Sequence, residues 1–273
     1  MNRIEAAFKN KPIFMPYFPL GYPDLDTSVD VIEALAKNGA DLIEVGLSFS
    51  DPLADGPVIQ KATQMALEQG ITVKKSLEAV RELRRRGVDI PLVLMGYYNP
   101  MLAYGLEKFV CDAVDAGADG FIVPDLPAEE SNELQSALRQ LQRTSTTSEK
   151  STRSPLSAKP LIQMLAPTTP DERMEKIARD AQGFIYLVSV TGVTGERNTL
   201  SEGLGGLIQK VREHTTLPVC VGFGIGTPEQ AKQVGALADG VIVGTACVRT
   251  IGSSEKPIET AKQFAVEFQR ALS

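Results

Sequence analysis

Two carboxylates that lie close together in the chain, Glu44 and Asp55, have the clearest capacity for chemistry. Glu44 belongs to the apolar run 41–46, a predicted short strand, and side chains alternate between the two faces of a strand. Glu44 therefore shares a face with Leu42, where an ionised carboxylate is costly unless it is paired or used. Asp55 follows in a loop that neighbouring prolines and a glycine bend. The two acids could form an acid–base pair, but a structurally paired Glu44 followed by ordinary turn residues explains the same spacing.

Glycine-rich loops in the second half of the chain suggest phosphate chemistry. Residues 222–226 contain three glycines and lead into a predicted helix, and Gly244 and Thr245 open another helical turn. Glycines let backbone N–H groups approach an anion, and a helix N-terminus presents its positive dipole end. Residues 189–198 form a further loop rich in glycine and threonine, whose length suits a mobile lid, with simple surface flexibility as the alternative.

Internal repetition indicates how these residues are positioned. The run Gly-Ala-Asp before a short apolar strand occurs at 39–41 and 117–119, and Ala-Asp returns at 238–239. The aspartates are 78 and then 120 residues apart, which is two and three units of about 40. Five further strand-like runs bring the predicted total to eight strands: 13–18, 91–96, 160–165, 184–188 and 217–222.

Amphipathic helical patterns separate these strands, for example at 28–37, 73–86, 106–116 and 229–234. Strict alternation of strand and helix predicts a parallel sheet covered by helices. We therefore predict an α/β fold, a (β/α)8 TIM barrel forming a single domain over residues 1–273, with its chemistry at the C-terminal strand ends. A doubly wound open sheet is the alternative, but residues 19–23 after the first strand lack its glycine-rich fingerprint.

One segment departs from this alternation. Nine of the 14 residues in 144–157 are serine or threonine. Such a segment can bury too little apolar surface to become ordered. We predict a flexible insertion on the face of the barrel opposite the active site, with no function of its own.

Composition narrows the class of protein. The chain has 28 Lys and Arg against 34 Asp and Glu, with no basic block, which argues against nucleic acid and anionic membrane partners. Its three cysteines are widely spaced and read as reduced thiols, and no apolar run approaches the length of a membrane span. Residues 1–10 are predicted to form a short amphipathic helix without a signal-peptide pattern. We expect a cytoplasmic protein.

Seven blocks of the chain resemble the tryptophan synthase α subunit family. Together they span nearly the whole length, and residues 50–57 within the second block are highly specific to that family. The matching blocks are residues 16–23, 44–60, 95–100, 123–127, 165–170, 191–195 and 222–225.

The resemblance implies retro-aldol cleavage of indole-3-glycerol phosphate to indole and glyceraldehyde 3-phosphate. It makes Glu44 the general acid–base residue and Asp55 the partner of the indole N–H, contacted by Thr194 when the lid closes. Apolar neighbours should raise the pKa of Glu44. Other positions that the resemblance places around the substrate are Tyr17, Met95, Tyr97 and Tyr186 for the indole and the acid, and Gly195, Gly224, Gly244 and Thr245 for the phosphate.

The resemblance also implies a partner, the β subunit of an αββα tetramer, which carries pyridoxal phosphate (PLP) and receives the indole. No predicted strand end of this chain carries a lysine for a Schiff base, so no cofactor is expected here. The expected contact surface comprises residues 50–57, 101–106 and 125–127.

Other functions remain open on the residues alone. A stand-alone lyase of the same lineage would share every motif, and a non-catalytic regulatory partner would share the fold. A metal-dependent sugar-phosphate epimerase is disfavoured because His214 is the only histidine, whereas a flavin or nicotinamide barrel would share the phosphate loops.

Overall fold

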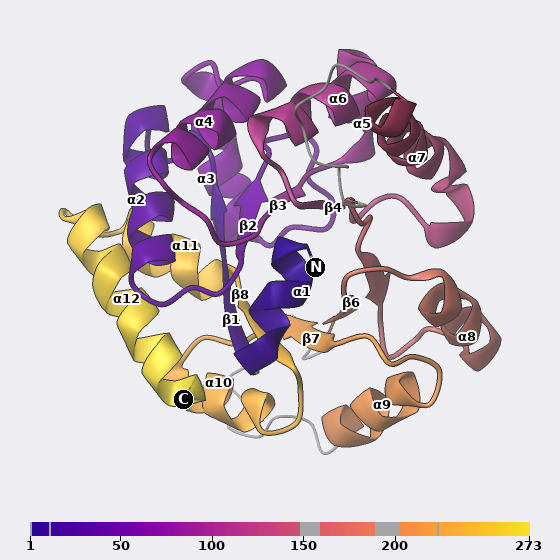
Figure 1. Cartoon of the computed structure of the whole chain (residues 1–273). Coiled ribbons are helices and arrows are strands. Elements are labelled where there is room, and N and C mark those ends of the chain that lie inside the picture. Colours follow the sequence, from indigo (N-terminus) through magenta and orange to yellow (C-terminus); the bar gives the residue numbers. More distant parts are fainter. Residues whose placement is uncertain (1, 11, 148–158, 189–202, 223) are drawn as a thin grey trace.

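A computed structural model describes residues 2–10, 12–147, 159–188, 203–222 and 224–273. Eight strands occur in this part of the chain, each close to a run predicted from the sequence (Figure 1). They are β1 (Ile13–Pro19), β2 (Ile43–Gly46), β3 (Leu92–Met95), β4 (Gly120–Ile122), β5 (Gln163–Leu165), β6 (Ile185–Val188), β7 (Val219–Gly222) and β8 (Gly240–Val243).

The strands form one parallel sheet that curls into a barrel. Their order is β4-β3-β2-β1-β8-β7-β6-β5, so sequence neighbours pair throughout and β8 returns to β1. The remaining gap between β4 and β5 is joined by a parallel bridge between Phe121 and Leu161, with hydrogen bonds of 2.9 Å from Phe121 N to Pro160 O and 2.8 Å from Ile162 N to Phe121 O. The predicted (β/α)8 barrel is confirmed, and the open sheet is excluded.

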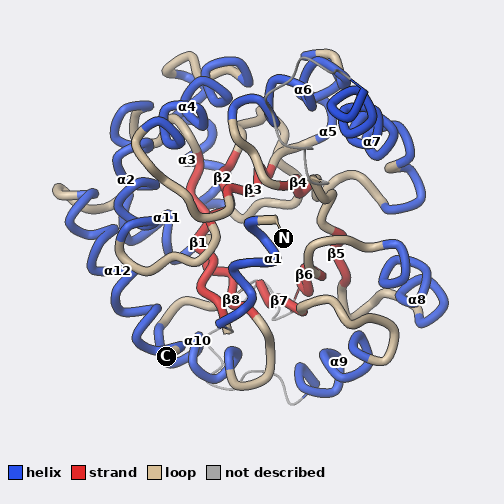
Figure 2. Tube along the Cα trace, in the orientation of Figure 1, coloured by secondary structure: helices blue, strands red, loops and turns tan. Residues whose placement is uncertain are grey.

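Helices surround the strands as an outer ring (Figure 2). Two helices begin slightly earlier than predicted, each after a residue whose side chain caps the helix N-terminus. Asp24 accepts a bond of 2.8 Å from Thr27 N at the start of one, and Thr227 precedes Pro228 in the first turn of the other. The α-helices are α1 (Arg3–Ala7), α2 (Leu25–Lys37), α3 (Pro57–Glu68), α4 (Val73–Arg85), α5 (Tyr98–Tyr104), α6 (Leu106–Ala116), α7 (Asn132–Thr147), α8 (Asp171–Asp180), α9 (Gly203–Arg212), α10 (Pro228–Gly235), α11 (Thr245–Gly252) and α12 (Pro257–Leu272); two short 3₁₀ turns are η1 (Phe8–Asn10) and η2 (Ala128–Glu130).

The helix α1 covers the end of the barrel at which the strands begin. Figures 1 and 2 show it lying across the centre of the strands. Ile4 is buried in the cluster of side chains that fills the barrel, and Phe8 of η1 packs against Phe184 with ring centroids 5.8 Å apart. This end is therefore filled, and a substrate must approach from the opposite end, where the strands finish.

The repeated aspartates have a structural role at this lower end. Each exchanges two hydrogen bonds with a residue at or next to the start of the neighbouring strand, using its carboxylate as acceptor and its own N–H as donor. Asp41 pairs in this way with Phe14 (2.8 and 3.0 Å), Asp119 with Leu92 (3.1 and 2.8 Å) and Asp239 with Val219 (3.0 and 2.8 Å). The motif thus joins β1 to β2, β3 to β4 and β7 to β8.

Asp119 is also the centre of a partly buried charge cluster. Its carboxylate accepts from Arg84 of α4, from Arg3 of α1 at 3.2 Å and from Lys159 at 3.1 Å. Arg84 further donates to the carbonyl of Gly117. One carboxylate therefore holds together α1, α4 and the starts of β3 and β4.

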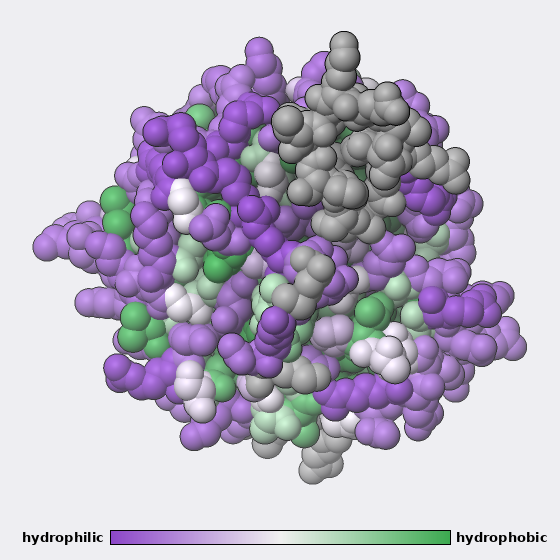
Figure 3. All heavy atoms as spheres, viewed as in Figure 1, coloured by the Kyte–Doolittle hydropathy of each residue, from purple (hydrophilic) through white to green (hydrophobic). Residues whose placement is uncertain are grey.

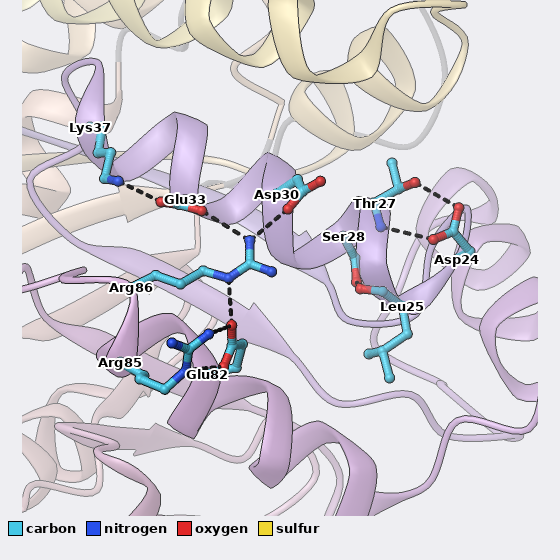
Figure 4. Close-up of polar contacts among 10 residues, drawn as sticks. All are labelled: Asp24, Leu25, Thr27, Ser28, Asp30, Glu33, Lys37, Glu82, Arg85 and Arg86. Carbon is cyan, nitrogen blue, oxygen red and sulfur yellow. Dashed lines mark hydrogen bonds and ion pairs between the residues drawn. The ribbon is translucent and has the colours of Figure 1, made fainter.

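A second ion-pair network lies on the outer surface between α2 and α4. Arg86, at the end of α4, contacts Asp30 and Glu33 of α2 at 2.6 and 3.0 Å and Glu82 of its own helix at 2.7 Å (Figure 4). The described face in Figure 3 is mostly hydrophilic, with apolar groups small and scattered. No described helix is long and apolar enough to cross a membrane.

The helix α7 reaches into the serine- and threonine-rich segment. It extends to Thr147, so residues 144–147 are helical where the sequence predicted a flexible insertion. Residues 148–157 of the predicted insertion lie outside the described part of the chain.

We expect Asp119→Ala to lower the free energy of unfolding by about 3 kcal/mol, because it removes the charge partner of a partly buried arginine and leaves the N–H of Leu92 without its acceptor. Asp180→Ala is the matched control: it removes a carboxylate from an exposed ion pair with Arg179 and should change stability by less than about 0.5 kcal/mol. Urea unfolding followed by circular dichroism measures both. Equal effects would show that Asp119 is no more than a surface charge.

Candidate active site

Glu44 is a buried carboxylate, and one of its two oxygens has no hydrogen-bond partner among the described residues. It lies on the inner face of β2 and is 1% exposed, and its Oε1 atom has no hydrogen-bond partner in the described part of the chain. Burial alone raises its pKa from 4.5 to about 8. The buried Asp119 and Asp239, by contrast, both accept bonds from backbone and from arginine. The structure therefore excludes the reading of Glu44 as a structurally paired residue within the described chain.

Asp55 lies above Glu44, in the loop between β2 and α3, and a tyrosine holds its side chain. The Tyr97 hydroxyl donates to Asp55 Oδ2 at 3.0 Å and accepts from Ala54 N at 3.0 Å. Partial burial raises the pKa of Asp55, and the bond from Tyr97 opposes that rise. Tyr97 comes from the end of β3, so the loop that bears Asp55 is fixed by the neighbouring strand.

Two further tyrosines, Tyr17 of β1 and Tyr186 of β6, point into the barrel beneath this loop. Both are buried, and their hydroxyl oxygens lie 2.3 Å and 2.5 Å from where a Cβ would stand on Gly46 and Gly222. A side chain at either glycine would displace the tyrosine. Burial raises the pKa of both hydroxyls, and the nearby charges of Glu44 and Asp55 raise it further, so both remain protonated.

Apolar side chains form the wall beside these polar groups. Met95 is partly buried at the end of β3, and Phe49 packs on Tyr97 with ring centroids 5.4 Å apart. Met164 of β5 and Val188 of β6 occupy equivalent partly buried positions. Our sequence reasoning did not select these last two, although strand alternation places Val188 on the same face as Tyr186 and would have indicated it.

The helix α11 offers the more accessible anion site of the two predicted loops. No side chain caps its N-terminus at Gly244, whereas Thr227 caps α10 by accepting a bond from Gln230 N at 3.3 Å. A Cβ on Gly244 would lie 3.8 Å from Tyr17 Cβ, so this helix start adjoins the pocket. Gly224 has φ of +78°, a conformation that favours glycine.

The structure thus brings together most of the predicted site residues. Glu44, Asp55, Tyr17, Met95, Tyr97, Tyr186 and Gly244 surround the C-terminal ends of β1, β2, β3, β6 and β8, with Thr245 opening α11 and Gly224 following β7. Thr194, Gly195 and the rest of the predicted lid lie outside the described residues. The arrangement combines a protonated buried acid, a second carboxylate, an apolar wall and an anion site.

Comparison with known proteins gives one consistent result. The family profile of the tryptophan synthase alpha chain matches residues 4–273. The tryptophan synthase alpha chain of Roseiflexus sp. (strain RS-1) is 44% identical over 100% of this chain and 99% of the relative. That of Chloroflexus aurantiacus (strain ATCC 29364 / DSM 637 / Y-400-fl) is 47% identical over 91% of this chain and 89% of the relative.

Solved structures agree with the sequence comparisons. Tryptophan synthase subunit alpha from Legionella pneumophila str. Paris superposes with a TM-score of 0.86 at 34% identity, covering 99% of this chain and 98% of that one. A chain of tryptophan synthase from M. tuberculosis, in an open form with BRD0059 bound, superposes with a TM-score of 0.84 at 31% identity, covering 100% and 99%.

The raised pKa of Glu44 makes stability depend on pH. Between pH 4.5 and 8 the folded state keeps the Glu44 proton while the unfolded state loses it, so stability should fall as pH rises through this window. The largest effect is about 5 kcal/mol, because each pKa unit corresponds to about 1.4 kcal/mol. Glu44→Gln should remove this component and be more stable than the unsubstituted chain at pH 8.5. Urea unfolding of both proteins at pH 5 and 8.5 measures the change in the free energy of unfolding with pH. An equal change in the two proteins would contradict the assigned role of Glu44.

Proposed function

The chain belongs to the tryptophan synthase alpha chain family, and on that premise we propose that Glu44 and Asp55 carry its reaction. Members of this family are lyase subunits that cleave indole-3-glycerol phosphate, and this is the reaction of the present chain. The observation that supports our assignment most directly is the burial of Glu44, whose Oε1 has no hydrogen-bond partner in the described part of the chain.

Glu44 has the properties that both proton transfers require. Cleavage needs a proton added to C3 of the indole and a proton removed from the hydroxyl on the adjacent glycerol carbon. With its pKa raised to about 8, Glu44 is protonated at neutral pH and can donate first. The resulting carboxylate, still desolvated, then removes the hydroxyl proton. The bond between C3 and the glycerol carbon breaks, its electrons restore the neutral indole, and an aldehyde forms on the departing fragment.

Asp55 would stabilise the charge that appears between these two transfers. Protonation at C3 leaves positive charge on the ring nitrogen, and a carboxylate within hydrogen-bond reach of that N–H opposes it. The bond from Tyr97 to Asp55 Oδ2 leaves Oδ1 to accept from the ring. Tyr17, Met95 and Tyr186, with Met164 and Val188, would surround the indole.

The phosphate of the substrate is assigned to the start of α11. Gly244 and Thr245 present backbone N–H groups there, and the helix dipole favours an anion. Gly224 after β7 and Gly195 of the predicted lid complete the proposed cradle, and Thr194 of that lid is proposed to contact Asp55.

We further propose that the partner is a tryptophan synthase β subunit in an αββα tetramer, with PLP held by that subunit. The loop 50–57 supports this, because Leu53 at its tip is 81% exposed and a shallow hollow of about 380 Å³ lies against it. Its lining residues are Phe49, Ser50, Pro52, Pro57, Gln60, Lys61 and Gln64.

A cytoplasmic location is proposed as well, supported by three cysteines that form no disulfide with one another.

A chain of contacts connects this proposed interface to the site. Asp55 bonds to Tyr97, and the next residue, Tyr98, donates its N–H to Asp125 at 3.0 Å. Segments 50–57 and 125–127 of the proposed contact surface are therefore joined through Tyr97 and Tyr98, at the start of α5, and that helix leads into segment 101–106. A partner that orders this surface would also order Asp55.

We expect Glu44→Gln to lower kcat by at least about 100-fold, because the amide can neither give nor take the proton. Asp55→Asn should have a comparable effect, since an amide cannot balance charge on the ring nitrogen. Glu107→Gln on the surface of α6 is the matched control and should leave kcat unchanged. The assay is indole release from indole-3-glycerol phosphate. Near-normal turnover of a folded Glu44→Gln protein would refute the proposal that Glu44 is the acid–base residue.

For the partner, we expect sedimentation of this chain with a tryptophan synthase β subunit to show a larger species and indole release to increase. Leu53→Ser should weaken the association about tenfold, or ~1.4 kcal/mol, by removing apolar contact. Leu237→Ser, at an exposed leucine before β8, should leave it unchanged. Separate sedimentation combined with rapid turnover of the chain alone would instead identify a stand-alone lyase.

A further inference from the structure

The tip of Tyr17 lies near both carboxylates assigned to the reaction. Tyr17 of β1 is the register partner of Glu44 on β2, so the two inward side chains start from neighbouring positions. The Tyr17 hydroxyl oxygen, however, lies 2.3 Å from where a Cβ on Gly46 would stand. Gly46 is two residues beyond Glu44, roughly 6 to 7 Å further toward the open end of the barrel. The hydroxyl is therefore above Glu44, on the side from which Asp55 and the substrate approach.

The other end of the same side chain adjoins the proposed phosphate site. Tyr17 Cβ lies 3.8 Å from the Cβ position of Gly244, at the start of α11. The ring thus extends from the end of β8 to the end of β2, with its hydroxyl at the end remote from the phosphate. A substrate whose phosphate lies at α11 would have its reacting carbon nearer the hydroxyl.

The Tyr17 hydroxyl is a donor whose hydrogen bond is not used within the described residues. No hydrogen bond to another described group involves it, although the residue is only 5% exposed. The Tyr97 hydroxyl, by contrast, both donates and accepts. Burial first, and then the charge of Asp55, the neighbouring Tyr97 and the charge of Glu44, raise the pKa of Tyr17 well above its ordinary value, so it is a neutral donor at neutral pH.

We propose that Tyr17 is a further catalytic residue whose hydroxyl donates a hydrogen bond to the carbinol oxygen of the substrate, the same oxygen from which Glu44 removes a proton. The inference rests on the function proposed above. The ring nitrogen of indole carries a hydrogen and needs an acceptor, which Asp55 supplies, whereas a tyrosine donor needs a substrate acceptor. Away from the phosphate, the carbinol oxygen at the reacting carbon is the acceptor that must come close to Glu44.

The chemical effect follows from where charge develops. As Glu44 takes the O–H proton, negative charge builds on the carbinol oxygen until the bond to C3 breaks and the aldehyde forms. A fixed neutral donor stabilises that charge without transferring its own proton, and it acts in a pocket from which water is largely excluded. The Tyr17 proton remains on Tyr17, so the proton balance of the reaction is unchanged.

The test is Tyr17→Phe, which keeps the ring and removes the donor. We expect kcat for indole-3-glycerol phosphate to fall about tenfold or more, with KM changed less than twofold and with both limbs of the pH profile in place, because Tyr17 does not titrate in this range. Tyr22→Phe is the matched control: it removes a hydroxyl that bonds to Gly252 O at 3.4 Å, away from the pocket, and should leave kcat unchanged.

Binding of 3-(indol-3-yl)propyl phosphate, which has the ring and phosphate but no carbinol oxygen, separates the donor from simple packing. Calorimetry should give equal affinity for the unsubstituted chain and Tyr17→Phe. An unchanged kcat in Tyr17→Phe would overturn the inference and leave the proposed function intact. A loss of analogue affinity that matches the loss of kcat would also overturn it, since Tyr17 would then act by packing. Failure of the unsubstituted chain to cleave the substrate would instead refute the proposed function.

Discussion

The burial of a single carboxyl, that of Glu44, is the constraint on which the pocket depends. Its Oε1 atom has no hydrogen-bond partner among the described residues. Burial of an ionised carboxylate without a partner is strongly unfavourable, and the protein responds by raising the pKa of the group to about 8. This requires a closed, well-packed interior beneath the acid. The side chains of α1 and η1 provide it from below, where Ile4 is buried and Phe8 packs on Phe184. Closure of the opposite end of the barrel therefore contributes to the burial that raises the pKa of Glu44.

The same fold uses buried acids in two different ways. At the lower end, Asp41, Asp119 and Asp239 accept backbone N–H groups of neighbouring strands, and the last two also accept from arginines. These carboxylates are paired, so they stabilise the barrel. Glu44 lies three residues beyond Asp41, inside β2, and its Oε1 has no hydrogen-bond partner among the described residues. Position along the strand thus separates the paired aspartates from an acid whose Oε1 has no partner among the described residues.

The sequence was sufficient for the architecture and for the inward position of Glu44, because both depend on local patterns. Strand alternation placed Glu44 inward, and apolar runs located all eight strands to within a few residues. It did not show that the repeated aspartates join pairs of strands, since that contact needs the register of the sheet. Met164 was missed because its strand is only three residues long and gives almost no alternation signal. The bond between Tyr97 and Asp55 joins residues 42 positions apart and follows only from the fold.

The shape of the pocket depends on two matched pairs of tyrosine and glycine. Tyr17 pairs in register with Glu44 and covers Gly46, two residues further along; Tyr186 pairs with Cys220 and covers Gly222, again two residues further along. In each case a missing side chain on one strand makes room for a ring from its neighbour, which brings a hydroxyl toward the barrel axis. Neither member of a pair is informative alone, because glycine at a strand end is ordinary and an inward tyrosine is usually core. Only the register of β1 with β2 and of β6 with β7 turns these four residues into two polar groups inside the barrel, so the pocket is specified by strand pairing as much as by its carboxylates.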